Sequence, residues 1–255
     1  MKLTKTLLTT ALLGASIFFF QSTAWADTLE QQFQQGLTAY EQSDYQTAFK
    51  LWLPMEEQGD AKAQYNLGVM YDKGRGVKQD DFEAVKWFRK AAEQGDAKAQ
   101  FNLGVMYDDG LGVKQDDFEA VKWYRQAAKQ GYAKAQLNLG NMYADGRGVK
   151  QDDFEAVKWF RKAAEQGDAD AQANLGSAYF TGRGVRQDYT EAVKWFKKAA
   201  ENGSANGQFK LGLSYLVGQS IQKDRTLAKE WFGKACDNGE QRGCEYYGKL
   251  NRGEL

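Results

Sequence analysis

Apolar and small residues recur along this chain in a pattern that repeats every 36 residues. In the stretch 60–95, one set of them has the three-and-four spacing of a single helix face: Ala61, Gln64, Leu67, Gly68 and Tyr71. A second set has the same spacing: Ala84, Val85, Phe88, Ala91 and Ala92. The pattern therefore predicts two helices in each repeat, which in this one run over 61–72 and 82–94.

Five full repeats follow one another, over residues 60–95, 96–131, 132–167, 168–203 and 204–239. Two landmarks advance in step with them: Gly68, Gly104, Gly140, Gly176 and Gly212, and Trp87, Trp123, Trp159, Trp195 and Trp231. A helix pair of this period buries its apolar face only by stacking on its neighbours. The sequence therefore predicts an all-α fold, an α-solenoid of antiparallel helix pairs, with the large tryptophan side chains in the core.

The two ends of the solenoid depart from the full repeat. Residues 27–59 form a shorter version of the helix pair, and Pro54 in its second helix is expected to bend or break that helix. Residues 240–255 contain one polar helix, which suits the terminal cap that a solenoid requires.

Turn and cap residues lie at the helix ends of each repeat. Asp80 or Asp81 is placed to cap the second helix at its start, and Gly95 stands where a helix C-cap residue is expected. Gly68 has no side chain at the point where an aromatic ring of the second helix can press against the first. A change of Gly68 to leucine is therefore expected to overpack this contact.

The first 26 residues have the organisation of a cleaved secretory signal. Lys2 and Lys5 precede a mostly apolar run over 7–20, and Ala24-Trp25-Ala26 has the small-x-small form of a cleavage site. No later stretch approaches the roughly 20 apolar residues that a bilayer span requires. We therefore expect an exported protein without a membrane span, located in the periplasm of a Gram-negative bacterium.

The charge of the chain argues against nucleic acid as a partner. Lysine and arginine together number 34, and so do aspartate and glutamate; loss of the two signal lysines leaves a net charge of −2. Proteins that bind nucleic acid usually present a basic face.

The repeat resembles that of a known family. The motif A-x-A-Q-x-N-L-G-x-M-Y, followed by G-x-G-V and D-x-x-E-A-V-K-W-F-x-K-A-A-x-x-G, is similar to the Sel-one-like repeat, a relative of the tetratricopeptide repeat with a longer loop between its helices. The shorter pair over 27–59 looks closer to an ordinary tetratricopeptide repeat. The resemblance implies a right-handed superhelix whose first helices line a concave surface, and a role as an adaptor or scaffold in protein complexes.

The two cysteines extend this resemblance. Cys236 occupies the position of Ala92 in its repeat, and Cys244 that of Gln100. The cysteine-rich secreted branch of the family has disulfides at this spacing, so the resemblance implies a disulfide, which an oxidising compartment would favour. The alternative is a redox or metal site, although the chain contains no histidine and no third cysteine to complete one.

Little in the sequence points to catalysis. The absence of histidine excludes histidine-based triads and histidine general bases. Ser220 and Lys223 fit the S-x-x-K pattern of serine β-lactamases, and the cysteine-rich branch has been associated with weak activity of that kind, but S-D-N and K-T-G are both missing. The recurring carboxylates at the start of each second helix are interpreted as caps rather than as acid–base or calcium sites. We expect no enzyme activity, cofactor or metal.

The candidate partner-binding residues lie on the first helix of each repeat. An asparagine precedes the Leu-Gly pair at Asn66, Asn102, Asn138 and Asn174; its amide can donate to and accept from a peptide main chain, or alternatively bridge neighbouring repeats. Two further series are expected to border the same groove: Tyr65, Phe101, Leu137, Ala173 and Phe209, and Val69, Val105, Asn141, Ser177 and Leu213. Lys210 replaces the asparagine in the last repeat and adds a charge there.

Three functional hypotheses follow from these residues. The leading one is a periplasmic interaction module that holds a peptide or a segment of a partner protein in its concave groove. The others are a cell-wall protein that binds or weakly hydrolyses a β-lactam or a peptidoglycan fragment, and an assembly scaffold that binds through its convex face.

Overall fold

The computed structural model describes residues 28–56 and 58–255. The predicted signal segment lies outside the described residues. Those residues form helices and connecting turns, without a strand, as the sequence predicted. They divide into two compact units, and each is described by itself.

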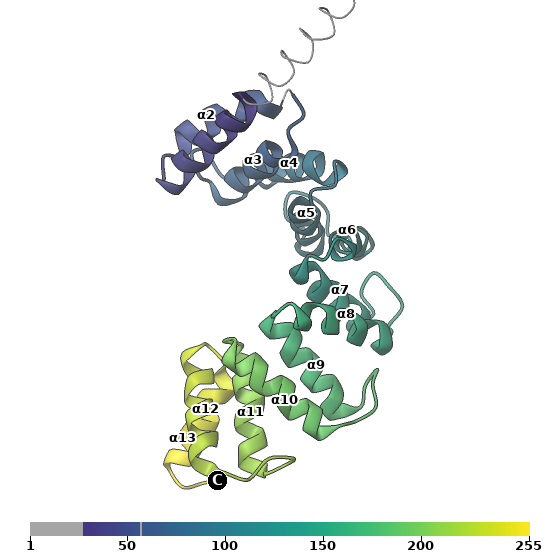
Figure 1. The fold of residues 1–255 in the computed structure, drawn as a ribbon, viewed down its shortest axis with the longest axis vertical. Helices are drawn as coiled ribbons and strands as arrows, with labels where there is room; N and C mark the ends of the chain where they lie inside the picture. Colours follow the sequence, from purple (N-terminus) through teal and green to yellow (C-terminus); the bar gives the residue numbers. More distant parts are fainter. Residues whose placement is uncertain (1–27, 57) are drawn as a thin grey trace, which may run out of the picture. The chain divides into compact units, whose positions relative to one another are not determined.

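The N-terminal unit contains the described residues up to Ala99 together with Leu111–Val113. It begins with a helix over 28–41, followed by α2 (Tyr45–Glu56), α3 (Ala61–Lys73) and α4 (Asp81–Glu93). These helices and those of the second unit can be followed in Figure 1.

The C-terminal unit contains the larger part of the chain, Gln100–Gly110 and Lys114–Leu255. Its helices are α5 (Ala97–Asp109, which starts in the first unit), α6 (Asp117–Lys129), α7 (Ala133–Asp145), α8 (Asp153–Glu165), α9 (Ala169–Thr181), α10 (Tyr189–Glu201), α11 (Ala205–Val217), α12 (Arg225–Asp237) and α13 (Gln241–Asn251). We call α3, α5, α7, α9 and α11 the A helices, and α4, α6, α8, α10 and α12 the B helices.

Hydrogen bonds at both ends of a repeat show that its two helices are antiparallel. In the third repeat, Gln166 at the end of α8 donates its Nε2 to Oε1 of Gln136 near the start of α7, at 2.8 Å. At the opposite end, the Asp152 amide donates to the Tyr143 carbonyl at 2.9 Å. The predicted helix pair is thus confirmed.

Aspartates begin the B helices as expected. Asp80 accepts hydrogen bonds from the amides of Phe82 and Glu83, at 3.0 and 3.1 Å, which satisfies two of the donors left free at a helix start. Gly95, just after the end of α4, has a φ of +95°, a conformation that favours glycine.

The glycines of the A helices allow close packing of each pair. A Cβ atom built on Gly68 would lie 2.6 Å from Cδ1 of Phe88, and one built on Gly176 would lie 2.7 Å from Cδ1 of Phe196. The same relation joins Gly36 to Trp52 in the shorter N-terminal pair, where a Cβ atom would lie 2.2 Å from the indole Nε1.

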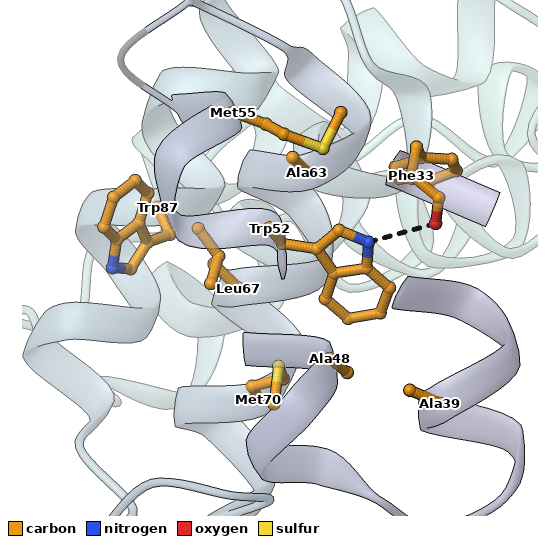
Figure 2. Close-up of a cluster of buried hydrophobic side chains, with 9 residues drawn as sticks. All are labelled: Phe33, Ala39, Ala48, Trp52, Met55, Ala63, Leu67, Met70 and Trp87. Carbon is orange, nitrogen blue, oxygen red and sulfur yellow. Dashed lines mark hydrogen bonds between the residues drawn. The ribbon is translucent and has the colours of Figure 1, made fainter. Parts of the chain in front are cut away.

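The core of the N-terminal unit is built around Trp52 (Figure 2). Its side chain is 1% exposed, and its Nε1 donates to the Phe33 carbonyl at 3.3 Å. Of the two predicted effects of Pro54, a bend or a break, the break does not occur, because α2 continues through the proline to Glu56. The proline lies in the last turn, where few further backbone hydrogen bonds remain to be disturbed.

Buried glutamines connect successive repeats of the C-terminal unit. Gln136 is 4% exposed, and its Nε2 donates to the Ala128 carbonyl of the preceding B helix at 3.1 Å. Gln172 and Gln208 bond to the carbonyls of Ala164 and Ala200 in the same way. We call this eight-residue link the glutamine staple.

Candidate partner-binding face

The predicted asparagines lie partly buried on the A helices, at the same position of each helix. Asn174 of α9 donates its Nδ2 to Oδ1 of Asn141 on α7 at 3.1 Å, so the repeat-bridging alternative holds at this position. Asn138 lies within hydrogen-bonding reach of the Tyr124 hydroxyl, whose pKa is raised by burial and by the nearby Asp108 carboxylate.

A first hollow opens between α7, α8 and α9. It has a volume of about 280 Å³, an apolar floor and a polar rim. The floor is formed by Ala144, Ala156, Val157, Phe160 and Ala178, and the rim by Asn141, Asp145, Asp153, Asn174, Ser177, Thr181 and Arg183. The bonded pair Asn141 and Asn174 keeps one amide NH₂ and one amide oxygen that no other described residue uses. These atoms could bond to a peptide main chain.

A second hollow lies next to the first, between α9, α10 and α11. Its volume is about 190 Å³, and its lining is Ser177, Phe180, Thr181, Phe196, Lys210, Leu213, Ser214, Val217 and Gln219. Ser177 and Thr181 belong to both hollows, so the two adjoin within the C-terminal unit. We call the residues of α7, α9 and α11 that line them the A-helix face.

The charges around this face are unevenly compensated. Arg183 at the first hollow is paired with Asp153, with Nη2 2.9 Å from Oδ1. Lys210 at the second hollow has no carboxylate oxygen of a described residue within 4.0 Å of its Nζ. Burial lowers the pKa of Lys210, the nearby Arg242 lowers it further, and Glu240 acts in the opposite direction.

Several other predicted residues occupy less open positions. Phe209 is 4% exposed and stacks on Phe232 and Tyr246, with ring centroids 5.7 and 5.5 Å away, so it lies in the core and does not border a groove. Ala173 is fully buried. The remaining predicted groove residues are partly buried on their helices: Tyr65, Asn66, Val69, Phe101, Asn102, Val105, Leu137 and Leu213.

The sequence analysis missed Phe180 and Val217, which give the second hollow its apolar character. Phe180 is 41% exposed and Val217 is 66% exposed. A signal was present in the two residues that follow the tyrosine of each A helix, which read Asp-Lys, Asp-Asp, Ala-Asp, Phe-Thr and Leu-Val in order along the chain. The charged residues of the first three repeats are replaced in the last two by uncharged ones, three of the four being apolar.

Three B helices have an exposed phenylalanine in their first turn. Phe82, Phe118 and Phe154 are 76%, 76% and 77% exposed, although each is a large apolar side chain. They lie on α4, α6 and α8 and do not line either hollow.

The residues proposed for other chemistry do not assemble into sites. Ser220 and Lys223 lie in the loop before α12 and not on a helix, so the helical spacing that would place them on one face is absent. No group of three potential metal ligands comes together among the described residues. The recurring aspartates serve as helix caps, as described above.

The two cysteines are joined in a disulfide. Cys236 of α12 and Cys244 of α13 have their sulfur atoms 2.01 Å apart. Their positions are those of Ala128 and Gln136 in the glutamine staple, so a covalent bond replaces the last hydrogen-bonded link.

Comparison with known proteins decides the family. The family model of the Sel1 repeat matches residues 33–60, 61–96, 97–132, 133–168, 169–204 and 205–240. The chain belongs to the Sel1 repeat family. The match includes the short N-terminal pair, which counts as a sixth Sel1 repeat. Such repeats form a generally non-enzymatic helical scaffold of the kind typical of protein–protein interaction.

Solved structures of similar proteins agree with this fold. A Sel1 repeat protein from Oxalobacter formigenes is 36% identical with a TM-score of 0.82, and the match covers 86% of this chain and 87% of that one. A protective antigen of uropathogenic Escherichia coli strains that displays an SLR fold is 37% identical with a TM-score of 0.79. That match covers 92% of this chain and 51% of the antigen, so this chain spans about half of the antigen's length. An immunity protein from Pseudomonas aeruginosa is 20% identical with a TM-score of 0.52, and the match covers 81% of this chain and 83% of that one. At this identity the likeness shows the fold alone.

No helix among the described residues has the length and apolar character needed to cross a membrane.

Proposed function

We propose that this Sel1 repeat protein is a periplasmic adaptor or scaffold whose A-helix face in the C-terminal unit binds a peptide or a segment of a partner protein. The observation that carries the proposal is the pair of adjoining hollows on α7, α9 and α11, with apolar floors and a few polar groups at the rim. Binding sites for extended segments commonly combine these two features.

The distribution of variable positions supports the same face. The positions that build the stack differ little between the full repeats, as the glycine opposite the B-helix aromatic ring illustrates. Among the rim positions, by contrast, residue 141 is asparagine where the first two repeats have valine and the fourth has serine. A packing role alone gives no reason for this difference between the two sets.

The periplasmic location rests on the signal-like segment over 1–26 and agrees with the disulfide Cys236–Cys244, a bond that persists in oxidising compartments. Osmotic-shock fractionation of cells that produce the full chain tests it. We expect release with periplasmic markers and a mature N-terminus at Asp27. Retention in spheroplasts with Met1 in place would contradict the proposed location.

The binding proposal is tested with a partner captured by periplasmic cross-linking and then purified. The affinities of two variants for this partner are compared with that of wild type. The first variant combines Asn141→Arg with Ser177→Arg, and the second combines Asn66→Ala, Asn102→Ala and Asn138→Ala. We expect the first variant to lose at least tenfold, because two long charged side chains would obstruct the hollows. A matched pair on exposed B-helix positions, Lys158→Ala with Lys194→Ala, should retain wild-type affinity. An unchanged affinity of both sets of A-helix variants would reject the proposed site.

A second candidate is an assembly scaffold that binds through its B helices. It is favoured by one observation, the exposed phenylalanines Phe118 and Phe154 at the starts of two B helices of the C-terminal unit. Exposed apolar side chains that recur in order can mark an interaction surface. Loss of partner binding in Phe118→Ser with Phe154→Ser, but not in the A-helix variants, would establish this function instead.

A further inference from the structure

Lys210 differs from the lysines of the B helices. Four of those pair with a glutamate one turn earlier: Lys86, Lys122, Lys158 and Lys194. Others lie over tryptophan rings, as Lys198 does with its Nζ 4.3 Å from the ring centroid of Trp195. Lys210 is partly buried on α11 and has neither kind of partner among the described residues. A cation withdrawn from water without a counter-ion is unfavourable, so its presence calls for an explanation.

The charge of the neighbouring arginine is already compensated. Arg242 donates to both carboxylate oxygens of Glu240, at 2.8 and 2.7 Å, and its guanidinium lies 4.5 Å from the ring centroid of Phe209. Glu240 is therefore committed to Arg242 and to the start of α13. Glu240 acts on Lys210 only from beyond ion-pair distance, so Lys210 is the cation at this end of the A-helix face that has no direct ion pair with a described residue.

The second hollow lies directly beside this charge. Its lining contains Phe180, Phe196, Leu213 and Val217 together with Lys210. Its volume of about 190 Å³ is below the roughly 300 to 1,000 Å³ of pockets that hold a drug-sized ligand or cofactor. A space of this size suits one large apolar side chain.

We infer that the second hollow and Lys210 form a subsite for a partner segment in which a large apolar side chain lies next to a carboxylate. This inference rests on the proposed function and specifies the chemistry of the partner. The apolar side chain enters the hollow between α9 and α11, and the carboxylate accepts a charge-assisted hydrogen bond from Nζ of Lys210. A lysine supplies a single point charge, whereas sites for phosphate usually combine several donors, so a carboxylate is the matching anion. The carboxylate can be that of Asp or Glu, or a chain terminus.

The test uses an array of random-sequence dodecapeptides, each attached through its N-terminus and present both as the C-terminal acid and as the amide. The purified full chain is applied to it, and the strongest ligands are resynthesised for affinity measurement by fluorescence anisotropy. We expect enrichment of Leu, Ile, Met or Phe beside a carboxylate. Amidation of the C-terminus, or exchange of Asp or Glu for its amide, should reveal which carboxylate is bound.

Variants locate the binding site. Lys210→Met should weaken the selected peptides by about tenfold or more, the loss typical for a hydrogen bond to a charged group, while Lys210→Arg should stay within a few-fold of wild type. Ser177→Phe, which fills the hollow from α9, should weaken them to a similar extent. The exposed Lys197→Met on α10 serves as the matched control and should have no effect. Thermal unfolding of each variant verifies that it is folded.

The pKa of Lys210 gives a second readout. It is measured by NMR as a pH titration of the lysine signals after ¹³C-methylation. When a peptide carboxylate binds, the pKa of Lys210 should rise, because the new counter-ion favours the charged form. Absence of any selected ligand, or selected ligands whose affinity depends neither on a carboxylate nor on Lys210, would overturn the inference. If such ligands still lose affinity in Asn141→Arg with Ser177→Arg, the proposed function stands and only its specified chemistry is wrong.

Discussion

The glycines of the A helices are the residues that set the distance between the paired helices. A glycine inside a helix is about 1 kcal/mol less favourable than alanine, so its presence in every repeat requires a benefit in packing. At Gly140 that benefit is visible, because a Cβ atom would lie 2.6 Å from two ring carbons of Phe160. The ring has little room to move away, because Phe160 is only 6% exposed.

Gly140→Ala is therefore expected to destabilise the protein by about 1 to 3 kcal/mol, since overpacking outweighs the gain in helix propensity. Gly233→Ala is the matched control: it also lies inside a helix, but its Cβ atom would approach Tyr247 only to 3.4 Å, an ordinary contact. This change should stabilise by about 0.5 to 1 kcal/mol. Urea unfolding of both variants measures the difference, and a stabilising Gly140→Ala would disprove the close-packing explanation.

Lys210 is expected to reduce the stability of the folded protein. Its partly buried ammonium has a lowered pKa, chiefly because burial disfavours the charged form. In the absence of a partner, Lys210→Met should raise the melting temperature by about 2 °C, the shift that a change on the order of 1 kcal/mol produces in a chain of this size.

The effect of Lys210 on stability should depend on pH. Between the lowered pKa of the folded state and the unfolded value of about 10.4, the unfolded chain binds more protons, so wild-type stability should rise with pH across that window. The stabilisation by Lys210→Met should accordingly be largest below the window and decrease through it. Thermal melts at neutral and alkaline pH measure both effects, and an equal gain at every pH would contradict this assignment.

At the scale of the helix, the elements could be predicted closely from the sequence. The structure places α3 at Ala61–Lys73 and α4 at Asp81–Glu93, within about one residue of the expected bounds. The reason is local: the capping aspartate, the glycine that follows the helix and the apolar face all lie within one repeat.

The contacts between repeats could not be predicted in this way. The glutamine staple joins a side chain of one A helix to a carbonyl of the preceding B helix, and the sequence shows only that a glutamine recurs. Phe209 looked like a groove residue because its register matches Tyr65, yet Tyr246 of α13 packs on it and completes the core. The two hollows likewise depend on which side chains of three neighbouring helices meet, and only Asn141, Asn174, Ser177, Lys210 and Leu213 were anticipated there.

The contribution of the disulfide Cys236–Cys244 to stability can be compared directly with that of the glutamine staple that it replaces. Removal of the bond in Cys236→Ser with Cys244→Ser should destabilise α13 by about 2 to 3 kcal/mol in the chain-entropy description. Cys236→Ala with Cys244→Gln instead restores the residues found in the other repeats and should recover about 1 kcal/mol of this loss through the amide–carbonyl bond. Full recovery is not expected, because a single amide–carbonyl hydrogen bond contributes less than the disulfide that it replaces.

Hydrogen exchange of the α13 amides measures how stable this helix is in each variant relative to wild type. Faster exchange in the serine pair than in the Ala and Gln pair is the expected order. Equal exchange in both variants would show that the staple contributes nothing at this position.

At the scale of the whole molecule, the chain presents two kinds of surface with different chemistry. The A-helix face of the C-terminal unit combines hollows, amide groups and Lys210, a cation without a direct ion pair to a described residue. The starts of the B helices carry exposed phenylalanines beside capping aspartates. The A-helix face holds two adjoining hollows lined largely by apolar side chains.

Site-specific photo-cross-linking in living cells tests the central claim most directly. A photoreactive phenylalanine analogue is placed at Ser177 or Leu213 on the A-helix face, and at Lys158 or Phe154 on α8, in the otherwise unchanged chain. We predict that a defined partner segment is captured from positions 177 and 213 and not from the two α8 positions, and that Lys210→Met reduces its yield. Capture of the partner from α8 alone, with none from positions 177 and 213, would contradict the account.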